Sequence, residues 1–327
     1  MHPRVQIVDG PLRAEIVPHL GAGLSGLWLE GTSGLIPLMR PAPADVEWFN
    51  ALACYTLTPW CNRIAMASLT FQGRVYPMRA DWVDGTAIHG IGKDHPWHVL
   101  DRSPVSASFL FRSQDVGRPN WPWTFESRIR YEVEAGSADR HGARDASHAL
   151  HVELTTRNTD STPMPYSCGF HPFYPQMGNS RIRLTTAPLE RYPAVEMIPY
   201  GPPARERLCE RFEQGTLLDL EPIDDVFRFT GTGYAGGVSD AASRRVRIEL
   251  PTGADIDVET SPEFGHFVVF SGRGPKGNEL DFACIEPVSA ANDGCNLENK
   301  GVKCGVMVLT PGEATTARWT LRVRARG

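Results

Sequence analysis

The sequence has no apolar run approaching the roughly 18 residues that a membrane-spanning helix requires. Its longest apolar stretches, such as residues 267–270 and 306–309, have only the length of a β-strand. The first ten residues, MHPRVQIVDG, contain no apolar core of a secretory signal. We therefore expect a cytoplasmic protein with no membrane partner.

The sequence also lacks an excess of charge of either sign. Its 33 Lys and Arg against 38 Asp and Glu give a formal net charge of −5 over 327 residues. Such a chain has no global basic field to attract a phosphate backbone. We expect no nucleic-acid partner.

Motifs for metals and cofactors are missing as well. The seven cysteines include no Cys-x-x-Cys pair, and the three histidines within residues 89–98 follow no zinc spacing. A P-loop and a Gly-x-Ser-x-Gly elbow are both absent. We expect no metal site, no cofactor and no serine hydrolase.

Turn residues, by contrast, are abundant. The 31 glycines and 27 prolines together form a larger share of this chain than the roughly 12% that these two residues form in an average protein. Between them, about sixteen segments rich in β-branched and aromatic residues recur from end to end. Residues 127–133 and 316–323 alternate apolar and polar side chains, which predicts strands with one wet face. Helical periodicity is confined to short stretches at 45–52 and 204–212.

These features predict an all-β fold. Since the strands run without a linker-like change in composition, we expect one large antiparallel β-sandwich domain over residues 1–327. Exposed sheet edges are compatible with a monomer or a homodimer, and the sequence does not choose between them.

Two segments carry candidates for acid–base chemistry. His171 lies among aromatic residues, after Gly169 and before Pro172, where a rigidly aimed imidazole suits a general acid near neutral pH. The alternative is a hydrogen-bonded core histidine. Glu286 ends an apolar strand before Pro287, and burial would raise its pKa toward that of a general base. The alternative is a strand-end carboxylate that faces water.

Other polar residues are candidates for binding a substrate. His89 ends a predicted strand and precedes a glycine, which presents its side chain at the rim of a sheet. Asn62 and Arg63 follow an aromatic residue. At this position the Arg63 guanidinium is a candidate to bind hydroxyls or a carboxylate, and the alternative is that Arg63 is a surface residue. Asp224 and Asp225 precede an apolar pair, where a carboxylate accepts hydrogen bonds from hydroxyls or caps a turn.

In this order, the segments resemble the aldose 1-epimerase (galactose mutarotase) family over about residues 60–315. The resemblance implies a β-sandwich of the supersandwich kind and a cofactor-free isomerase that interconverts the α and β anomers of a free aldose. The matching pieces are Asn62-Arg63-Ile64, Phe71-Gln72-Gly73-Arg74-Val75-Tyr76, His89-Gly90, His171-Pro172-Phe173, Asp224-Asp225-Val226-Phe227, Cys284-Ile285-Glu286-Pro287 and Leu309-Thr310-Pro311-Gly312-Glu313.

The resemblance also implies the catalytic roles. The histidine that matches His171 is the general acid toward the ring oxygen, and the glutamate that matches Glu286 is the base on the anomeric hydroxyl. Ring opening removes a proton from O1 and delivers one to O5, and closure on the other face reverses both transfers. An acid and a base on opposite sides of one sugar suffice for this, without a metal or a nucleotide.

The binding roles follow in the same way. The residues that match Arg63, His89 and Asp224 hold the hydroxyls and ring of the sugar, with Asn62 beside them. Asp224 is chosen over Asp225 by its offset from the apolar pair that follows. The expected partner is a small-molecule sugar.

The sequence leaves three other functions open. A related epimerase acting on a hexose 6-phosphate would need an extra cationic pocket, for which Arg63, Arg74 and Arg79 are candidates. A noncatalytic carbohydrate-binding sandwich would tolerate the loss of His171 or Glu286, and both are present. A lyase or hydrolase on a similar sandwich is a further possibility, since fold alone does not fix function.

Overall fold

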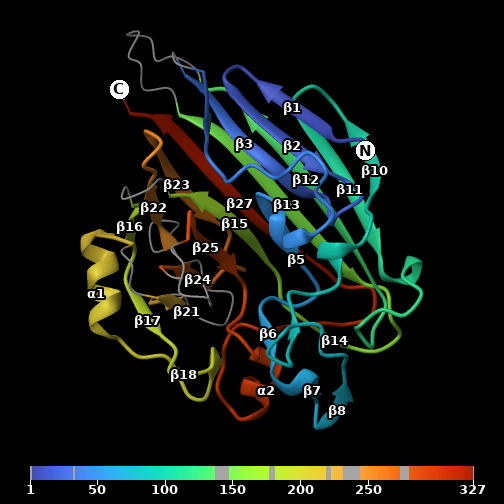
Figure 1. Cartoon of the computed structure of the whole chain (residues 1–327). Helices are drawn as coiled ribbons and strands as arrows, with labels where there is room; N and C mark the ends of the chain where they lie inside the picture. Colours follow the sequence, from blue (N-terminus) through green and yellow to red (C-terminus); the bar gives the residue numbers. More distant parts are fainter. Residues whose placement is uncertain are drawn as a thin grey trace.

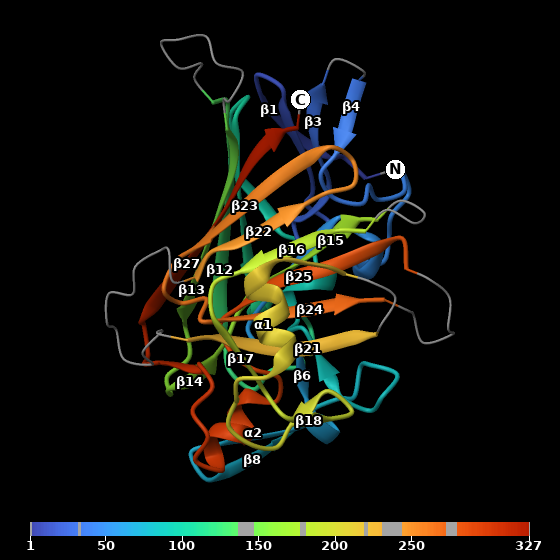
Figure 2. The same cartoon turned by 90° about the vertical axis from the view of Figure 1, so that its left-hand side faces the viewer.

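The computed structural model describes residues 2–31, 34–136, 147–176, 181–218, 222–230, 244–272 and 280–326. These form two large sheets that pack face to face (Figures 1 and 2). Neighbouring strands within both sheets pair antiparallel. The predicted all-β antiparallel sandwich is therefore confirmed.

The first sheet has ten strands in the described part of the chain. Their order is β1-β2-β3-β5-β15-β25-β24-β21-β17, and β4 pairs with β3 at the side. The bounds are β1 Val5–Asp9, β2 Leu12–Val17, β3 Gly23–Gly31, β4 Gly34–Pro37, β5 Cys54–Leu57, β15 Gly169–Pro175, β17 Leu189–Arg191, β21 Ile223–Phe229, β24 His266–Ser271 and β25 Phe282–Val288.

The second sheet has nine strands in the same described residues, in the order β10-β11-β12-β13-β27-β23-β22-β16-β20. Alternate residues of β12 are buried, as the sequence pattern predicts for a strand with one wet face. The bounds are β10 His98–Arg102, β11 Ser106–Arg112, β12 Phe125–Glu134, β13 His148–Asn158, β16 Arg183–Thr186, β20 Thr216–Leu217, β22 Val246–Glu249, β23 Ala254–Thr260 and β27 Ala314–Ala325.

Short elements close the ends of the sandwich. Two-stranded pairs are β6 Arg63–Ile64 with β9 Ala87–Ile88, β7 Ser68–Phe71 with β8 Arg74–Pro77, β14 Met164–Tyr166 with β26 Met307–Leu309, and β18 Ala194–Val195 with β19 Ile198–Pro199. The helices are α1 Arg207–Gln214 and α2 Gly294–Asn299, with 3₁₀ turns η1 Phe49–Ala51, η2 Ala65–Ala67, η3 Gly92–Asp94 and η4 Ser113–Asp115. Within the described ranges, none of the helices has the length and apolarity to cross a membrane.

The structure contains a helix at one of the two predicted positions and not at the other. The prediction at 204–212 is confirmed in part by α1, whereas 45–52 contains only the single 3₁₀ turn η1. There the Asn50 carbonyl accepts a hydrogen bond from the Arg40 guanidinium at 2.8 Å, and the Ala53 amide donates to β3. These tertiary contacts replace the bonds that would continue a helix.

The alternation of side chains along β15 decides what faces the core. Phe170 points between the sheets, where its ring stacks on that of Trp319 in β27 at 5.0 Å. Phe173 belongs instead to a second apolar cluster on the outer face of the ten-stranded sheet. Because successive residues of a strand point to opposite faces, His171 lies on that outer face with Phe173.

Candidate active site

A cavity of about 380 Å³ lies over the outer face of the ten-stranded sheet. The structure brings all six predicted site residues to this one cavity. They are Asn62, Arg63, His89, His171, Asp224 and Glu286. The other described residues that line the cavity were not predicted from the sequence as site residues. They are Asn50, Tyr55, Trp82, Val83, Asp84, Ile88, Phe173, Met197, Phe270, Leu280 and Phe282.

His171 and Glu286 contact each other in the cavity. Their strands, β15 and β25, are neighbours in the sheet, and His171 Nε2 lies 3.2 Å from Glu286 Oε1. The side chains are only 10% and 3% exposed. The two groups therefore do not stand on opposite sides of a sugar-sized space, because adjacent strands place them on one wall.

Burial governs the protonation of both groups. It lowers the pKa of His171 to about 3, and the positive charges of Arg40 and Arg63 act in the same direction. Burial raises the pKa of Glu286 well above its usual range, and the nearby Asp224 raises it further. Burial therefore disfavours the charged form of each group, and the two groups in contact titrate as a coupled pair.

The imidazole of His171 is held in a stack of aromatic rings. Tyr55 of β5 stacks on it at 4.6 Å with an interplanar angle of 20°, and Phe173 does so at 4.7 Å and 26°. The ring of His89 meets it edge-on at 5.2 Å. These contacts restrict rotation of the imidazole and keep Nε2 directed at Glu286.

Arg63 is held between acidic and amide groups. Its Nε donates a hydrogen bond to Asp84 Oδ2 at 2.9 Å, and its guanidinium lies 4.0 Å from Asp224 Oδ2. It also donates to Asn62 Oδ1 at 3.3 Å. The sequence offers a weak sign of Asp84, because Asp84-Gly85-Thr86 is a turn sequence just before His89.

Asp84 is kept ionised by its donors. Burial raises the pKa of this carboxyl, but hydrogen bonds from Thr86 and Arg63 outweigh burial and lower it overall. Thr86 Oγ1 donates to Asp84 Oδ1 at 2.7 Å. Asp84 thus supplies a fixed negative charge that orients Arg63.

The two adjacent aspartates of β21 face opposite sides of the sheet. Asp224 lines the cavity, whereas Asp225 forms an ion pair with Arg191 at 2.8 Å. Burial raises the pKa of Asp224 to about 6, although the Arg63 guanidinium opposes this shift. Asp224 therefore changes charge in the physiological range.

A strained turn presents His89. Its φ is +61° and that of Gly90 is +73°, and a Cβ on Gly90 would collide with the Thr58 carbonyl. The buried Lys93 ammonium donates to the Gly90 carbonyl at 2.7 Å. Only glycine fits at this position, so the turn is fixed by backbone sterics and by one buried charge.

The site residues are poorly suited to hold a metal. His171, Cys284 and Glu286 each place one ligand atom within 4.8 Å of the others. Burial, however, raises the pKa of the Cys284 thiol well above its usual range. A thiol must lose its proton to ligate a metal, so this group favours acid–base chemistry.

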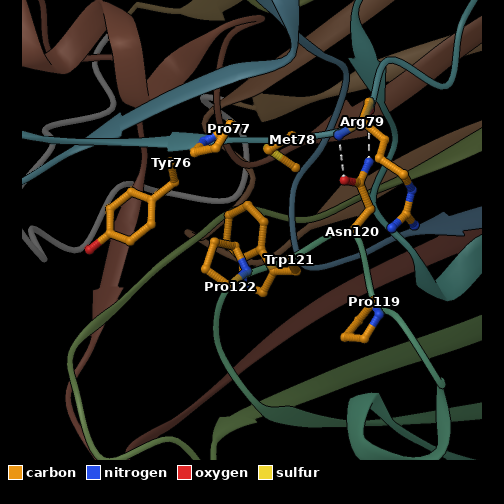
Figure 3. A pocket seen from close by; sticks show the side chains of 8 residues that line it. All are labelled: Tyr76, Pro77, Met78, Arg79, Pro119, Asn120, Trp121 and Pro122. Carbon is orange, nitrogen blue, oxygen red and sulfur yellow. Dashed lines mark hydrogen bonds between the residues drawn. The ribbon is translucent and has the colours of Figure 1, made fainter.

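A second cavity, of about 420 Å³, offers no comparable chemistry (Figure 3). Among the described residues its lining contains no histidine, cysteine or carboxylate. The side chain of Asn120 is tied to the backbone of Arg79 by hydrogen bonds of 2.8 and 2.9 Å. The lining residues are Tyr76, Pro77, Met78, Arg79, Pro119, Asn120, Trp121 and Pro122.

The chain is similar to known proteins over nearly its whole length. The sequence pattern of the family described as aldose 1-epimerase matches residues 3–322. The chain is 27% identical over 313 residues to the uncharacterized protein YphB of Escherichia coli K12, covering 93% of each.

Solved structures share the fold. A galactose mutarotase-like protein from Clostridium acetobutylicum superposes with a TM-score of 0.78 at 18% identity, covering 99% of this chain and 96% of the other. An aldose epimerase homologue from Caenorhabditis elegans gives 0.76 at 18% identity, with all of both chains covered.

Proposed function

The chain belongs to the aldose 1-epimerase family, and from this premise we propose that it interconverts the α and β anomers of a free aldose. The observation that carries the proposal is the contact between His171 and Glu286 at 3.2 Å. In a cyclic aldose, O1 and O5 are bonded to the same carbon. Two proton-transfer groups that share one wall of the cavity therefore reach both oxygens.

A coupled pair of this kind suits the reaction. Ring opening starts from the state in which His171 carries the proton and Glu286 is ionised: His171 delivers its proton to O5, and Glu286 takes the proton from O1. Because one proton leaves the pair and one enters it, the pair again holds one proton after opening. The same two steps in reverse close the ring after the aldehyde has rotated, which gives the other anomer.

The remaining polar residues bind the sugar in this proposal. Arg63 and His89 donate to ring and hydroxyl oxygens, while Asp224 and the Asn62 carboxamide bind hydroxyl groups. Apolar side chains such as Trp82 and Phe282 form part of the lining and can cover the C–H faces of the sugar.

A free sugar is favoured over a hexose 6-phosphate. Among the described residues that line the cavity, Arg63 is the one cation, and it already pairs with Asp84 and approaches Asp224. A dianionic phosphate would meet three carboxyl groups, those of Asp84, Asp224 and Glu286. That balance of charge disfavours a phosphate ester.

The proposal is tested by following anomer exchange by NMR with several free aldoses and their 6-phosphates. We expect catalysis with free sugars, and a fall of roughly 10²–10⁴-fold in Glu286→Gln and in His171→Asn. Glu153→Gln and His98→Asn, at exposed ion pairs, are matched controls that should retain activity.

Each alternative gives a different result in this experiment. Faster exchange of the 6-phosphates would replace the free aldose by a phosphorylated one. Sugar binding without catalysis would indicate a noncatalytic binding protein. Full activity in either active-site variant would refute the assignment of the pair.

A further inference from the structure

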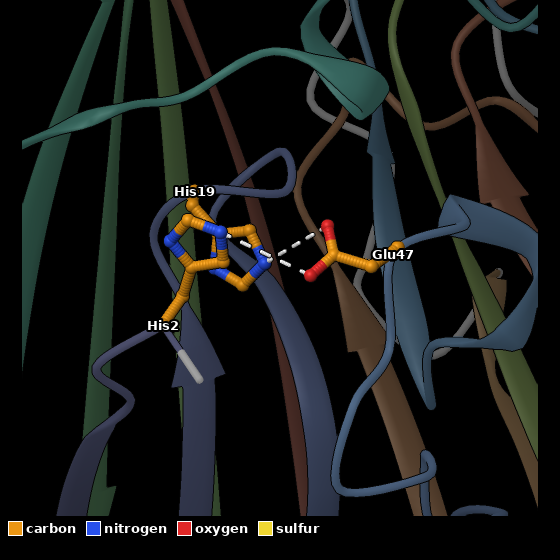
Figure 4. Close-up of side chains that lie close together, drawn as sticks. All are labelled: His2, His19 and Glu47. Carbon is orange, nitrogen blue, oxygen red and sulfur yellow. Dashed lines mark ion pairs between the residues drawn. The ribbon is translucent and has the colours of Figure 1, made fainter.

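A second cluster of ionisable side chains lies away from the sugar cavity, at the N-terminal edge of the fold (Figure 4). His2 precedes β1, His19 lies in the turn between β2 and β3, and Glu47 lies in the loop before η1. Each places one ligand atom within 4.8 Å of the other two. The imidazole rings of His2 and His19 stack at 4.0 Å.

The distances in this cluster are too long for hydrogen bonds. Nε2 of His2 lies 3.9 Å from one Glu47 oxygen, and Nε2 of His19 lies 3.9 Å from the other. Two ligand atoms that each lie about 2.0–2.2 Å from a tetrahedral zinc ion are roughly 3.3–3.6 Å apart. The two distances of 3.9 Å exceed this spacing by only a few tenths of an ångström. A small movement and rotation of the 56% exposed His2, whose ring stacks on that of His19, would complete the site.

The ring of His19 is prepared to act as a ligand. It is only 20% exposed, and neither of its nitrogens has a partner within hydrogen-bond geometry. The backbone carbonyl of Val46 lies by the ring, as carbonyls commonly do beside metal-bound imidazoles.

Arg4 independently anchors the segment that carries His2. Its guanidinium donates to the carbonyls of Pro43 and Ala44 at 2.6 and 2.7 Å, and to Glu15 at 2.6 Å. The N-terminal segment is thus docked on the loop that leads to Glu47. The three ligands consequently meet at a junction that other contacts already hold.

We propose that His2, His19 and Glu47 form a binding site for a divalent first-row transition metal ion such as Zn²⁺. Two imidazoles and a carboxylate suit zinc, nickel or copper, whereas magnesium and calcium prefer oxygen ligands alone. With three protein ligands, the fourth coordination position of the ion is open to a water molecule. The ion would tie the N-terminal segment to the loop that continues into Asn50, a residue of the sugar cavity.

The test is calorimetric titration of Zn²⁺ into chelator-treated protein that carries no added histidine tag. We expect one Zn²⁺ per chain, no comparable binding of Mg²⁺, and a rise in unfolding temperature with Zn²⁺. His2→Ala, His19→Gln and Glu47→Gln should each weaken Zn²⁺ binding by about tenfold or more. His2→Ala is decisive because this exposed residue precedes the first strand, so the variant should fold.

Two controls locate the ion. His98→Ala changes an exposed histidine that has a carboxylate at 3.1 Å but belongs to no three-residue ligand cluster in the described chain, and it should leave Zn²⁺ affinity unchanged. His171→Asn should also retain the Zn²⁺. Absence of Zn²⁺ binding, or equal affinity in wild type and His2→Ala, would overturn the proposal. Loss of binding in His171→Asn would place the metal in the sugar cavity and would equally overturn it.

Discussion

The rings of Tyr55 and His171 lie directly opposite each other on β5 and β15 and stack at 4.6 Å. Tyr55 is almost completely buried, so the contact is formed inside the protein and not at its surface. The proposed acid is thereby positioned by a neighbouring strand as well as by its own backbone.

Replacement of Tyr55 should affect catalysis through this stack. Tyr55→Leu should lower kcat by roughly 2- to 12-fold, which corresponds to the 0.5–1.5 kcal/mol of an aromatic pair. Tyr55→Phe keeps the ring and should restore the rate. Anomer exchange measures kcat, and thermal unfolding of both variants separates positioning from a general loss of stability. Equal rates in the Phe and Leu variants would show that the stack has no catalytic effect.

The two aspartates of β21 should respond differently to the same substitution. Asp224→Asn should raise KM for the sugar, because a carboxylate that accepts hydroxyl hydrogen bonds becomes a weaker amide acceptor. Asp225→Asn should leave KM unchanged and cost about 1 kcal/mol of stability or less, since its partner Arg191 is partly exposed. Steady-state kinetics and denaturant unfolding measure the two effects. A higher KM in Asp225→Asn alone would reverse the assignment.

Titration of Asp224 should appear in substrate binding. Its pKa is about 6, so the carboxyl is neutral below that pH and ionised above it. KM should fall as the pH rises through about 6, because the ionised form accepts hydroxyl hydrogen bonds more strongly. The step should vanish in Asp224→Asn. A step that persists in this variant would assign the titration to another group.

Asp84 should control the charge that faces the substrate. Asp84→Asn removes the charge-assisted hydrogen bond to Arg63, a contact of about 1.5–3 kcal/mol. We expect KM for free sugars to rise by roughly tenfold and inhibition by sugar 6-phosphates to become stronger. Asp115→Asn, at an exposed pair with His98, is the matched control. Unchanged inhibition by phosphates would show that Asp84 does not exclude them.

His266 should make the fold sensitive to acid. Its Nε2 pairs with the Tyr192 hydroxyl and its Nδ1 with the Ser289 carbonyl, both at 3.0 Å. Burial lowers its pKa to about 4, whereas an unfolded histidine titrates near 6.5. Between these values the unfolded chain binds the extra proton, so stability is complete above pH 6.5 and falls as the pH drops toward 4.

The size of this effect is measurable by denaturant unfolding at several pH values. A difference of 2.5 pKa units corresponds to about 3 kcal/mol across the window. His266→Gln should be less stable than wild type at pH 7, and its stability should fall less between pH 6.5 and 4. The same pH dependence in wild type and His266→Gln would assign the acid sensitivity to other histidines.

Much of the architecture followed from local patterns. The alternation in residues 127–133 marks β12, and the short apolar segments elsewhere correspond to strands of both sheets. The helix predicted at 45–52 failed because the Arg40 side chain and strand β3 take the hydrogen bonds of that segment. Local propensity could not anticipate those partners, which come from other parts of the chain.

By itself, the sequence determined the fold class, the family and six residues of the candidate site, because these depend on patterns within short segments. The tertiary structure decided which groups touch. Tyr55, Asp84 and the His2–His19–Glu47 cluster carry little or no local signal, since strand register and loop packing create their contacts. Those contacts join segments distant in sequence, and the burial they produce shifts the pKa values of His171, Glu286 and Asp224.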